Sequence, residues 1–110
     1  MLLWAIVAHF IADWLFQTEW MAVNKMNLRN PAIWVHGGIN TLLLILVFPW
    51  HLALLAGALH ILIDTRKPVA WWMTVIKGMK PSSPMYTHVQ IWVDQVLHIA
   101  VLAIMVLVFY

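Results

Sequence analysis

The stretch AHFIADWLFQ (residues 8–17) places a histidine and an aspartate four residues apart inside an otherwise apolar segment. The same spacing returns in LHILID, as His60 and Asp64, and in reversed order in DQVLH, as Asp94 and His98. Residues that are four apart lie on one face of an α-helix. Three helices that each carry a His–Asp pair on one face are therefore the starting point for predicting both fold and site.

The sequence around these pairs is too apolar for a surface that faces water. Of the 110 residues, 65% are hydrophobic and 9% are charged, whereas charged residues make up about 25% of an ordinary soluble domain. We therefore expect an all-α polytopic membrane protein, a single domain over residues 1–110 folded as a four-transmembrane-helix bundle. The expected spans are about 1–17, 31–48, 50–65 and 88–110, with an interfacial amphipathic helix at about 68–79.

The cations predict how these spans are oriented. They lie in the loop after the first span (Lys25 and Arg29) and in the loop after the third (Arg66, Lys67, Lys77 and Lys80). The short FPWH turn at 48–51 has none. Because cytoplasmic loops carry the excess of Lys and Arg, we expect an inner (plasma) membrane protein with both termini on the non-cytoplasmic side. The basic interfacial helix then serves as an anchor or as a lid over a site.

Direction and depth bring the acids to one level of the membrane. The first and third spans run toward the cytoplasm, so their His-then-Asp order places the aspartate nearer to it. The fourth span runs the other way, and its Asp-then-His order gives the same arrangement. His36, early in the second span, falls at a similar depth. A charged side chain at mid-bilayer costs at least about 2.5–3.5 kcal/mol, so these acids need partners.

Imidazole and carboxylate groups at one level predict a divalent metal site, with zinc favoured and iron or manganese as alternatives. The predicted metal ligands are His9, Asp13, His36, His60, Asp64, Asp94 and His98, and the predicted catalytic residues are Asp13, Asp64 and Asp94. This set exceeds one zinc shell. The surplus can hold a second metal, orient the ligands or act as a general base.

Nearby residues leave further alternatives open. Gln17 and Gln95 either contact the site or face the interface, and Gly37 and Gly38 beside His36 permit close helix approach. Two other histidines, at 51 and 88, fall outside the expected level. The first two His–Asp pairs are separated by 51 residues, as two copies of a helical hairpin would be.

Three functions remain open from the residues alone. The first is a metal-dependent hydrolase of a lipid-like or phosphorylated substrate, with its site near the cytoplasmic face. The second is a proton- or cation-handling protein that uses the same His/Asp cluster. The third is a small accessory subunit of a larger membrane complex. Membrane lipids are the expected partners, with a homo-oligomer or a larger complex also open, while the sparse cations do not form a nucleic-acid surface.

The order of the motifs also resembles a known family. AHFIADWLFQTEWMAVNK, an isolated histidine early in the second span, LHILIDTRK and DQVLH together resemble the small bacterial polytopic membrane protein family catalogued as domain of unknown function 3307. The resemblance implies a multi-span membrane protein. Its matching positions are His9, Asp13, Gln17, Lys25, His36, His60, Asp64, Asp94, Gln95 and His98. It implies no activity, so the functional hypotheses rest on the residues.

Overall fold

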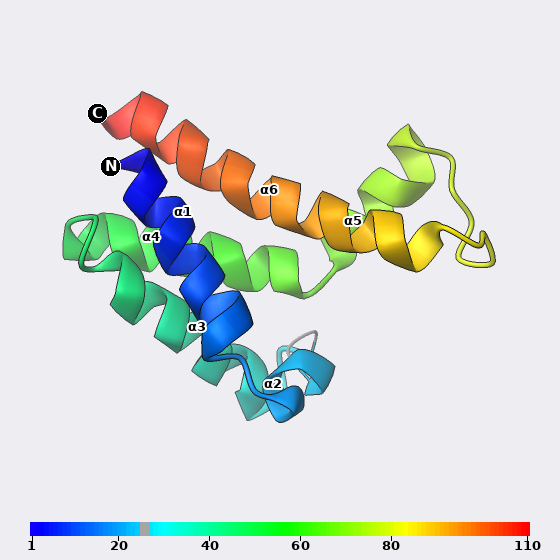
Figure 1. The fold of residues 1–110 in the computed structure, drawn as a ribbon, viewed down its shortest axis with the longest axis horizontal. Helices are drawn as coiled ribbons and strands as arrows, with labels where there is room; N and C mark the ends of the chain where they lie inside the picture. The colour runs from blue at the N-terminus through cyan, green and yellow to red at the C-terminus, as the bar shows by residue number, and fades with distance from the viewer. Residues whose placement is uncertain (25–26) are drawn as a thin grey trace.

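The computed structural model describes residues 1–24 and 27–110, and over these ranges it contains helices and no strand. The all-α prediction is confirmed, while Lys25 lies outside the described residues. The elements are α1 (Leu2–Phe10), the π-helix η1 (Ile11–Leu15), α2 (Glu19–Asn24), α3 (Pro31–Leu44), α4 (Trp50–Asp64), α5 (Lys67–Trp71), the π-helix η2 (Trp72–Ile76) and α6 (Tyr86–Phe109) (Figure 1).

Local sequence signals explain where several helices begin. The side chain of Asn30 accepts a hydrogen bond from the backbone N–H of Ala32 at 2.9 Å, and Pro31 fills the first turn of α3. Both are standard helix-start features. Helix α3 ends at Leu44, and turns fill most of the remainder of the predicted 31–48 segment. The short helix α2 lies in the polar stretch that the sequence analysis treated as a loop.

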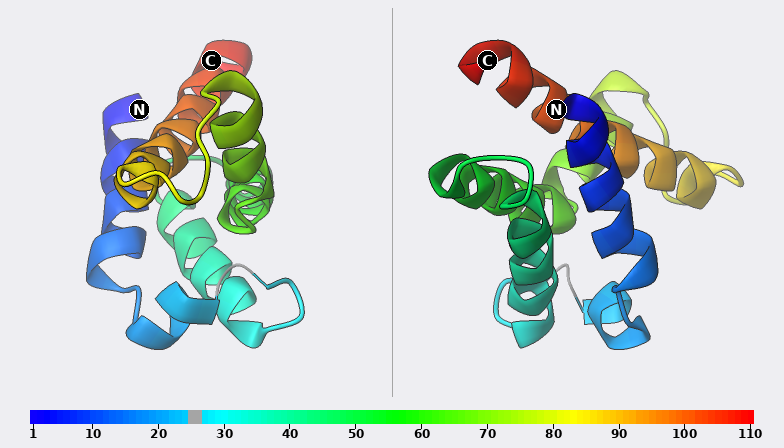
Figure 2. Two further views of the ribbon diagram at one scale, coloured as in Figure 1. Left: turned by 90° about the vertical axis from the view of Figure 1, so that its right-hand side faces the viewer. Right: turned by 60° about the vertical axis from the view of Figure 1, so that its left-hand side comes forward.

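Each of the four longer helical segments packs against two of the others. Helices α1 and α4 both contact α3 and α6. The rings of Phe48 and Tyr110 lie 6.2 Å apart, which places the α3–α4 turn beside the C-terminus. Figure 1 shows both termini and this turn on the left, with α2 below and α5 to the right, and the views in Figure 2 keep the two termini near one another.

The element order and contacts repeat once along the chain. The first half consists of α1, α2 and α3, and the second half consists of α4, α5 and α6. In the first half α1 and α2 both contact α3, and in the second half α4 and α5 both contact α6. Between the halves, α3 contacts α4 and α6 contacts α1. The predicted site residues follow the same repeat. The first helix of each half carries His-x3-Asp, at His9 and Asp13 or at His60 and Asp64, and the third helix of each half carries a buried histidine. The hairpin duplication suggested by the sequence thus has a counterpart in the contacts.

An apolar core fills the end near the termini. We call it the apolar layer: Ala5, Ala8, Leu44, Phe48, Leu52, Ala53, Ala56, Leu102 and Met105. Its alanines let the helices approach closely, as small residues do between membrane helices. A second cluster, Ile63, Val69 and Met73, joins α5 and η2 to the end of α4 and packs against the first half of α6.

Two glycines set the distance between α3 and α4. A Cβ added to Gly57 would overlap the Thr41 side chain, and one added to Gly37 would overlap Ile61. A Cβ on Gly38 would meet nothing within 4 Å. Of the two glycines beside His36, Gly37 is therefore the one that permits close approach.

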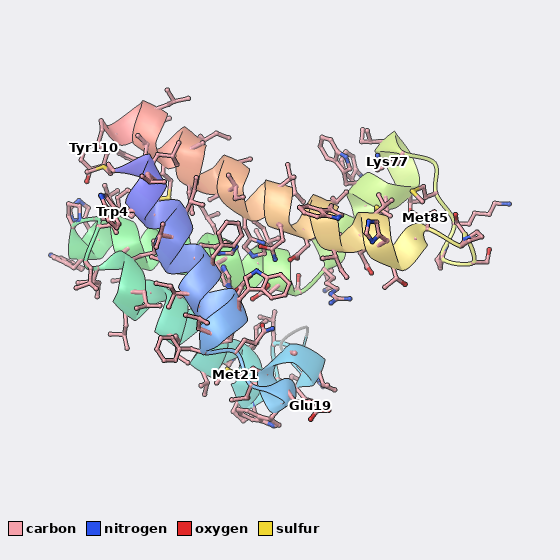
Figure 3. The ribbon with its side chains drawn as sticks, viewed as in Figure 1. Trp4, Glu19, Met21, Lys77, Met85 and Tyr110 are labelled. Carbon is pink, nitrogen blue, oxygen red and sulfur yellow. The ribbon has the colours of Figure 1, made fainter. Side chains whose placement is uncertain are left out.

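The outer surface is strongly apolar. Exposed side chains include Leu46 (83%), Leu107 (82%), Leu15 (75%) and Trp50 (68%). Figure 3 labels two exposed apolar side chains, Trp4 on α1 and Met85 in the turn before α6. Among the described residues, one helix, α6, is long and apolar enough to cross a membrane by length and composition. The apolar segments Leu2–Leu15 and Trp50–Asp64 are shorter.

Candidate metal centre

All seven predicted site residues come together in the interior. His9, Asp13, His36, His60, Asp64 and His98 are each at most 6% exposed, and the side chain of Asp94 is 13% exposed. On α1, α4 and α6 the site residues lie next to the apolar layer, on its side away from the termini. The sequence argument from spacing and chain direction thus leads to the observed cluster.

The short π-helix η1 positions the aspartate of the first pair. Asp13 lies at its middle, and the N–H of Phe16 donates to the carbonyl of Ile11 at 3.1 Å, five residues earlier. This wider turn leaves Asp13 Oδ2 3.3 Å from His9 Nε2 on the same segment and Oδ1 3.0 Å from His36 Nε2 on α3. Single π-turns of this kind are frequent at functional sites.

Asp64 and Asp13 each divide their two oxygens between two groups of histidines. Asp64 Oδ2 lies 2.9 Å from His60 Nε2 and 3.4 Å from His36 Nε2, while Oδ1 lies 3.4 Å from His98 Nε2. Asp13 Oδ1 lies 3.0 Å from His36 Nε2 and 3.8 Å from His60 Nε2, while Oδ2 faces His9. His36 and His60 therefore share one side of both carboxylates, and His9 and His98 take the other.

The spacing of these atoms is that of metal ligands. Four atoms at about 2.0–2.1 Å from a zinc ion in a tetrahedron lie about 3.4 Å from one another. The Nε2 atoms of His36, His60 and His98 lie 2.9–3.4 Å from a carboxylate oxygen. Yet within the described part of the chain these buried nitrogens have no hydrogen-bond partner of proper geometry. Ring nitrogens and carboxylate oxygens thus converge, as ligands do around a cation.

The tautomer of His98 also suits metal binding. Its Nδ1 lies 2.7 Å from the backbone carbonyl of Asp94. A carbonyl can only accept, so Nδ1 donates, and in the neutral ring Nε2 keeps its lone pair toward Asp64. Ligating histidines commonly donate their other ring N–H to a carbonyl or a carboxylate in this way.

Gln95 connects the centre to α6. Its Oε1 lies 3.1 Å from His9 Nε2, and its amide N–H groups donate to Asp13 Oδ2 at 3.1 Å and to Asp94 Oδ2 at 3.2 Å. Of the two glutamines that the sequence analysis left open, Gln95 is thus the one that contacts the site. Gln17 lies just beyond η1 and lines a cavity next to it.

Two adjoining cavities lead from the centre to the surface. The first, of about 160 Å³, is lined by Asp13, Trp14, Gln17, Ala22, Arg66, Gln90, Ile91, Asp94 and Gln95. The second, of about 370 Å³, is lined by Phe10, Trp14, His88, Ile91, Trp92, Gln95, Val96 and Ile99. They share Trp14, Ile91 and Gln95. The first is polar on several sides, and the second is largely apolar.

The cavities include residues whose position the sequence did not reveal. Arg66 has a left-handed backbone, with φ 62°, in the bend between α4 and α5. A non-glycine residue there is uncommon and often marks a functional constraint. Gln90 and His88 carried no motif of their own. His51 is exposed on the first turn of α4, near the termini.

The helical fold and the cluster of four histidines and three aspartates, all buried except the partly exposed Asp94, define an all-helical protein with a candidate metal centre. The chain belongs to the family described as Protein of unknown function (DUF3307), whose model matches residues 1–110. No curated protein and no solved structure gave a match to the chain. Function therefore has to be argued from the site.

Proposed function

We propose that the protein is a membrane-embedded, metal-dependent hydrolase acting on a lipid-like substrate that carries a phosphate group. The observation that carries this proposal is the convergence of seven His and Asp side chains from four helical segments beside an open cavity, six of them buried and Asp94 partly exposed at the cavity. Hydrogen bonds between membrane helices contribute only about 0.6–2 kcal/mol. A cluster of this size exceeds what helix association requires.

The distribution of polarity supports a four-span membrane bundle. Polar groups gather inside and large apolar side chains cover the outside, so the surface formed by residues 1–24 and 27–110 is too apolar to face water. Described cations such as Arg29, Arg66 and Lys77 lie in the connections at α2 and α5, away from the termini (Figures 1 and 3). Applied to these connections, the positive-inside rule assigns that end, and the cavity mouth, to the cytoplasmic face.

The segment from α5 through η2 fits the role of an interfacial anchor. It buries Val69 and Met73 against α4 and α6 and exposes Trp71 and Trp72. Exposed tryptophans favour the boundary between headgroups and acyl chains. Neither cavity is lined by a described residue of Trp71–Ile76, so an anchor is favoured over a lid.

The ligand set supports hydrolytic chemistry. Imidazole and carboxylate ligands suit zinc, with iron and manganese as alternatives. A bound divalent metal lowers the pKa of water toward 7 and polarises an ester or phosphoryl oxygen. Asp94 lines the cavity and is held by the Gln95 amide, a position suited to accepting a proton from water at the cavity face.

The two cavities favour an amphiphile as substrate. In the polar cavity, the Arg66 guanidinium and the amides of Gln17 and Gln90 can donate to phosphate oxygens. The apolar cavity beside it is bordered by Phe10 and Val96, which are exposed on the outer surface, and it suits an acyl chain entering from the bilayer.

A transmembrane proton path is less well supported. The buried polar side chains extend as far as Asn40 on α3. Beyond it the apolar layer, with Leu44, Phe48 and Leu102, fills the interior toward the termini. A path should carry polar groups across the whole membrane, so a hydrolytic site on one face is the better interpretation.

The test combines metal content with turnover. The protein is purified in mild detergent, its metal is measured by plasma mass spectrometry, and phosphate release is followed from a diacylglycerol phosphate. We expect bound zinc, iron or manganese, and activity that Asp64→Asn removes while Lys77→Gln, at an exposed position, retains it. Arg66→Gln should raise KM for the lipid phosphate by about tenfold, the loss of one charge-assisted contact of about 1.4 kcal/mol.

Contrary results would identify the alternatives. Metal-free protein that dissipates a pH gradient in vesicles would replace the hydrolase with proton handling. Unchanged cellular function after Asp64→Asn and Asp94→Asn together would leave the accessory-subunit role.

A further inference from the structure

We propose that the centre holds two metal ions, bridged by Asp13 and Asp64, with one ion on His36 and His60 and the second on His9 and His98. This inference rests on the metal-binding part of the proposed function and deepens it. It assigns the surplus ligands to a second cation.

The division of the carboxylate oxygens supports two positions. Asp64 directs Oδ2 to His36 and His60, and Oδ1 to His98 at 3.4 Å. Asp13 directs Oδ1 to His36 and His60, and Oδ2 to His9 at 3.3 Å. A single ion would draw both carboxylates toward one pair of histidines. Carboxylates whose two oxygens face different nitrogen pairs are arranged as bridges.

The internal repeat gives an independent reason. In the repeat, His60 is the counterpart of His9, Asp64 is the counterpart of Asp13, and His98 on α6 is the counterpart of His36 on α3. The first proposed ion would bind His36, His60 and both aspartates. Replacing each of these residues by its counterpart in the other half gives His98, His9 and both aspartates, which are the ligands of the second proposed ion. If one set binds a cation, the equivalent set offers the same four ligand types.

The rings of the second position lie close enough to share an ion. The centroids of His9 and His98 are 4.8 Å apart, those of His36 and His60 are 5.0 Å apart, and those of His60 and His98, across the two positions, are 4.4 Å apart, so ring spacing allows both positions while the carboxylate oxygens assign the pairs. Two-metal hydrolytic sites place their ions about 3.5–4 Å apart, which carboxylate bridges allow. Four-helix bundles build such paired sites from inward-facing carboxylates and histidines.

Charge also favours two ions. Three ionised carboxylates outweigh one divalent cation and leave the buried centre negative. Two divalent cations leave one positive charge, which matches a phosphate entering beside Arg66. A pair of ions would stabilise both the attacking and the leaving oxygen in phosphoester hydrolysis.

The experiment counts metal ions per chain. Wild-type protein in mild detergent is stripped, reloaded with excess Mn²⁺ and desalted, and its metal is measured by plasma mass spectrometry. We expect two ions per chain, falling to one in His9→Ala and in His98→Ala. His51→Ala, at an exposed position outside the seven-residue cluster and both cavities, is the matched control that should keep two.

Electron paramagnetic resonance of the Mn²⁺-loaded wild type gives a readout that needs no variant. Two bridged ions should give a spin-coupled spectrum at full loading, instead of the hyperfine pattern of an isolated ion. One ion per chain with an uncoupled spectrum would overturn this inference and leave the single-metal hydrolase intact. No bound ion with Mn²⁺ or Zn²⁺ would overturn the proposed function itself. Should His9→Ala fail to fold, the wild-type spectrum still decides between one ion and two.

Discussion

Replacing Gly57 by alanine should weaken both the α3–α4 contact and the metal centre, whereas the same change at Gly38 should not. A Cβ on Gly57 would overlap Thr41 Oγ1, whose hydroxyl donates to the carbonyl of Gly37 at 2.9 Å. Either the helices separate or Thr41 changes rotamer and gives up that hydrogen bond. Separation would also move His36 away from His60, because they lie on these two helices.

The magnitude follows from comparing the two replacements. Both gain the helix preference of alanine over glycine, about 1 kcal/mol, so this contribution cancels in their difference. Gly38→Ala meets nothing within 4 Å and should be neutral or stabilising. Overpacking at Gly57 costs about 1–3 kcal/mol. The free energy of unfolding of Gly57→Ala should therefore lie about 1–3 kcal/mol below that of Gly38→Ala.

The assay is denaturant unfolding in detergent, followed by helical circular dichroism, with Zn²⁺ affinity measured on the same samples by competition with a chelating dye. Gly37→Ala should fall between the other two, because it meets Cγ1 and Cδ1 of the apolar Ile61 side chain and not a hydrogen-bonded hydroxyl. If Gly57→Ala matches Gly38→Ala in both stability and Zn²⁺ affinity, the close contact of α3 with α4 does not support the site.

Three other predictions concern the centre directly. Asp64→Asn should remove both ions, since Asp64 faces histidines of both positions; retention of two ions by mass spectrometry would contradict its bridging role. Gln95→Leu removes the amide N–H contacts to Asp13 and Asp94 and should lower metal affinity by about 10–100-fold, measured by chelator competition. Unchanged affinity would show that the amide does not support the ligands. Because ligating histidines must be neutral and carboxylates ionised, protons compete with the metal. The amount of metal that the protein retains, measured by mass spectrometry, should therefore fall as the pH drops from about 8 to 5. A rise in the retained metal over this range would exclude histidine ligation.

Much of the site followed from spacing and chain direction. The i and i+4 rule paired His9 with Asp13 and Asp94 with His98, and alternating spans placed the pairs at one level. The rule did not decide between Gln17 and Gln95. Gln17 is four residues beyond Asp13, but the helical segment stops at Leu15, so its side chain lines the cavity while Gln95 makes the contacts.

Backbone irregularities were beyond the reach of periodicity. The π-turn of η1 and the left-handed Arg66 depend on tertiary contacts, and no local residue pattern marks them. Adjacent glycines also looked equivalent in the sequence. Neighbouring positions on a helix point about 100° apart, and only the partner helix determines that Gly37 faces inward and Gly38 outward.

Departures from the repeat explain why the centre opens on one side. On α3, the residues four and three positions before His36 are Ala32 and Ile33, and both are fully buried. The equivalent residues of α6 are Asp94 and Gln95, which line the cavity beside the centre. The two halves supply the same ligands, yet apolar packing closes the α3 side while a carboxylate and an amide keep the α6 side polar. In the proposed hydrolase, a substrate would therefore reach the centre between η1 and α6, where the apolar cavity meets the exposed apolar surface.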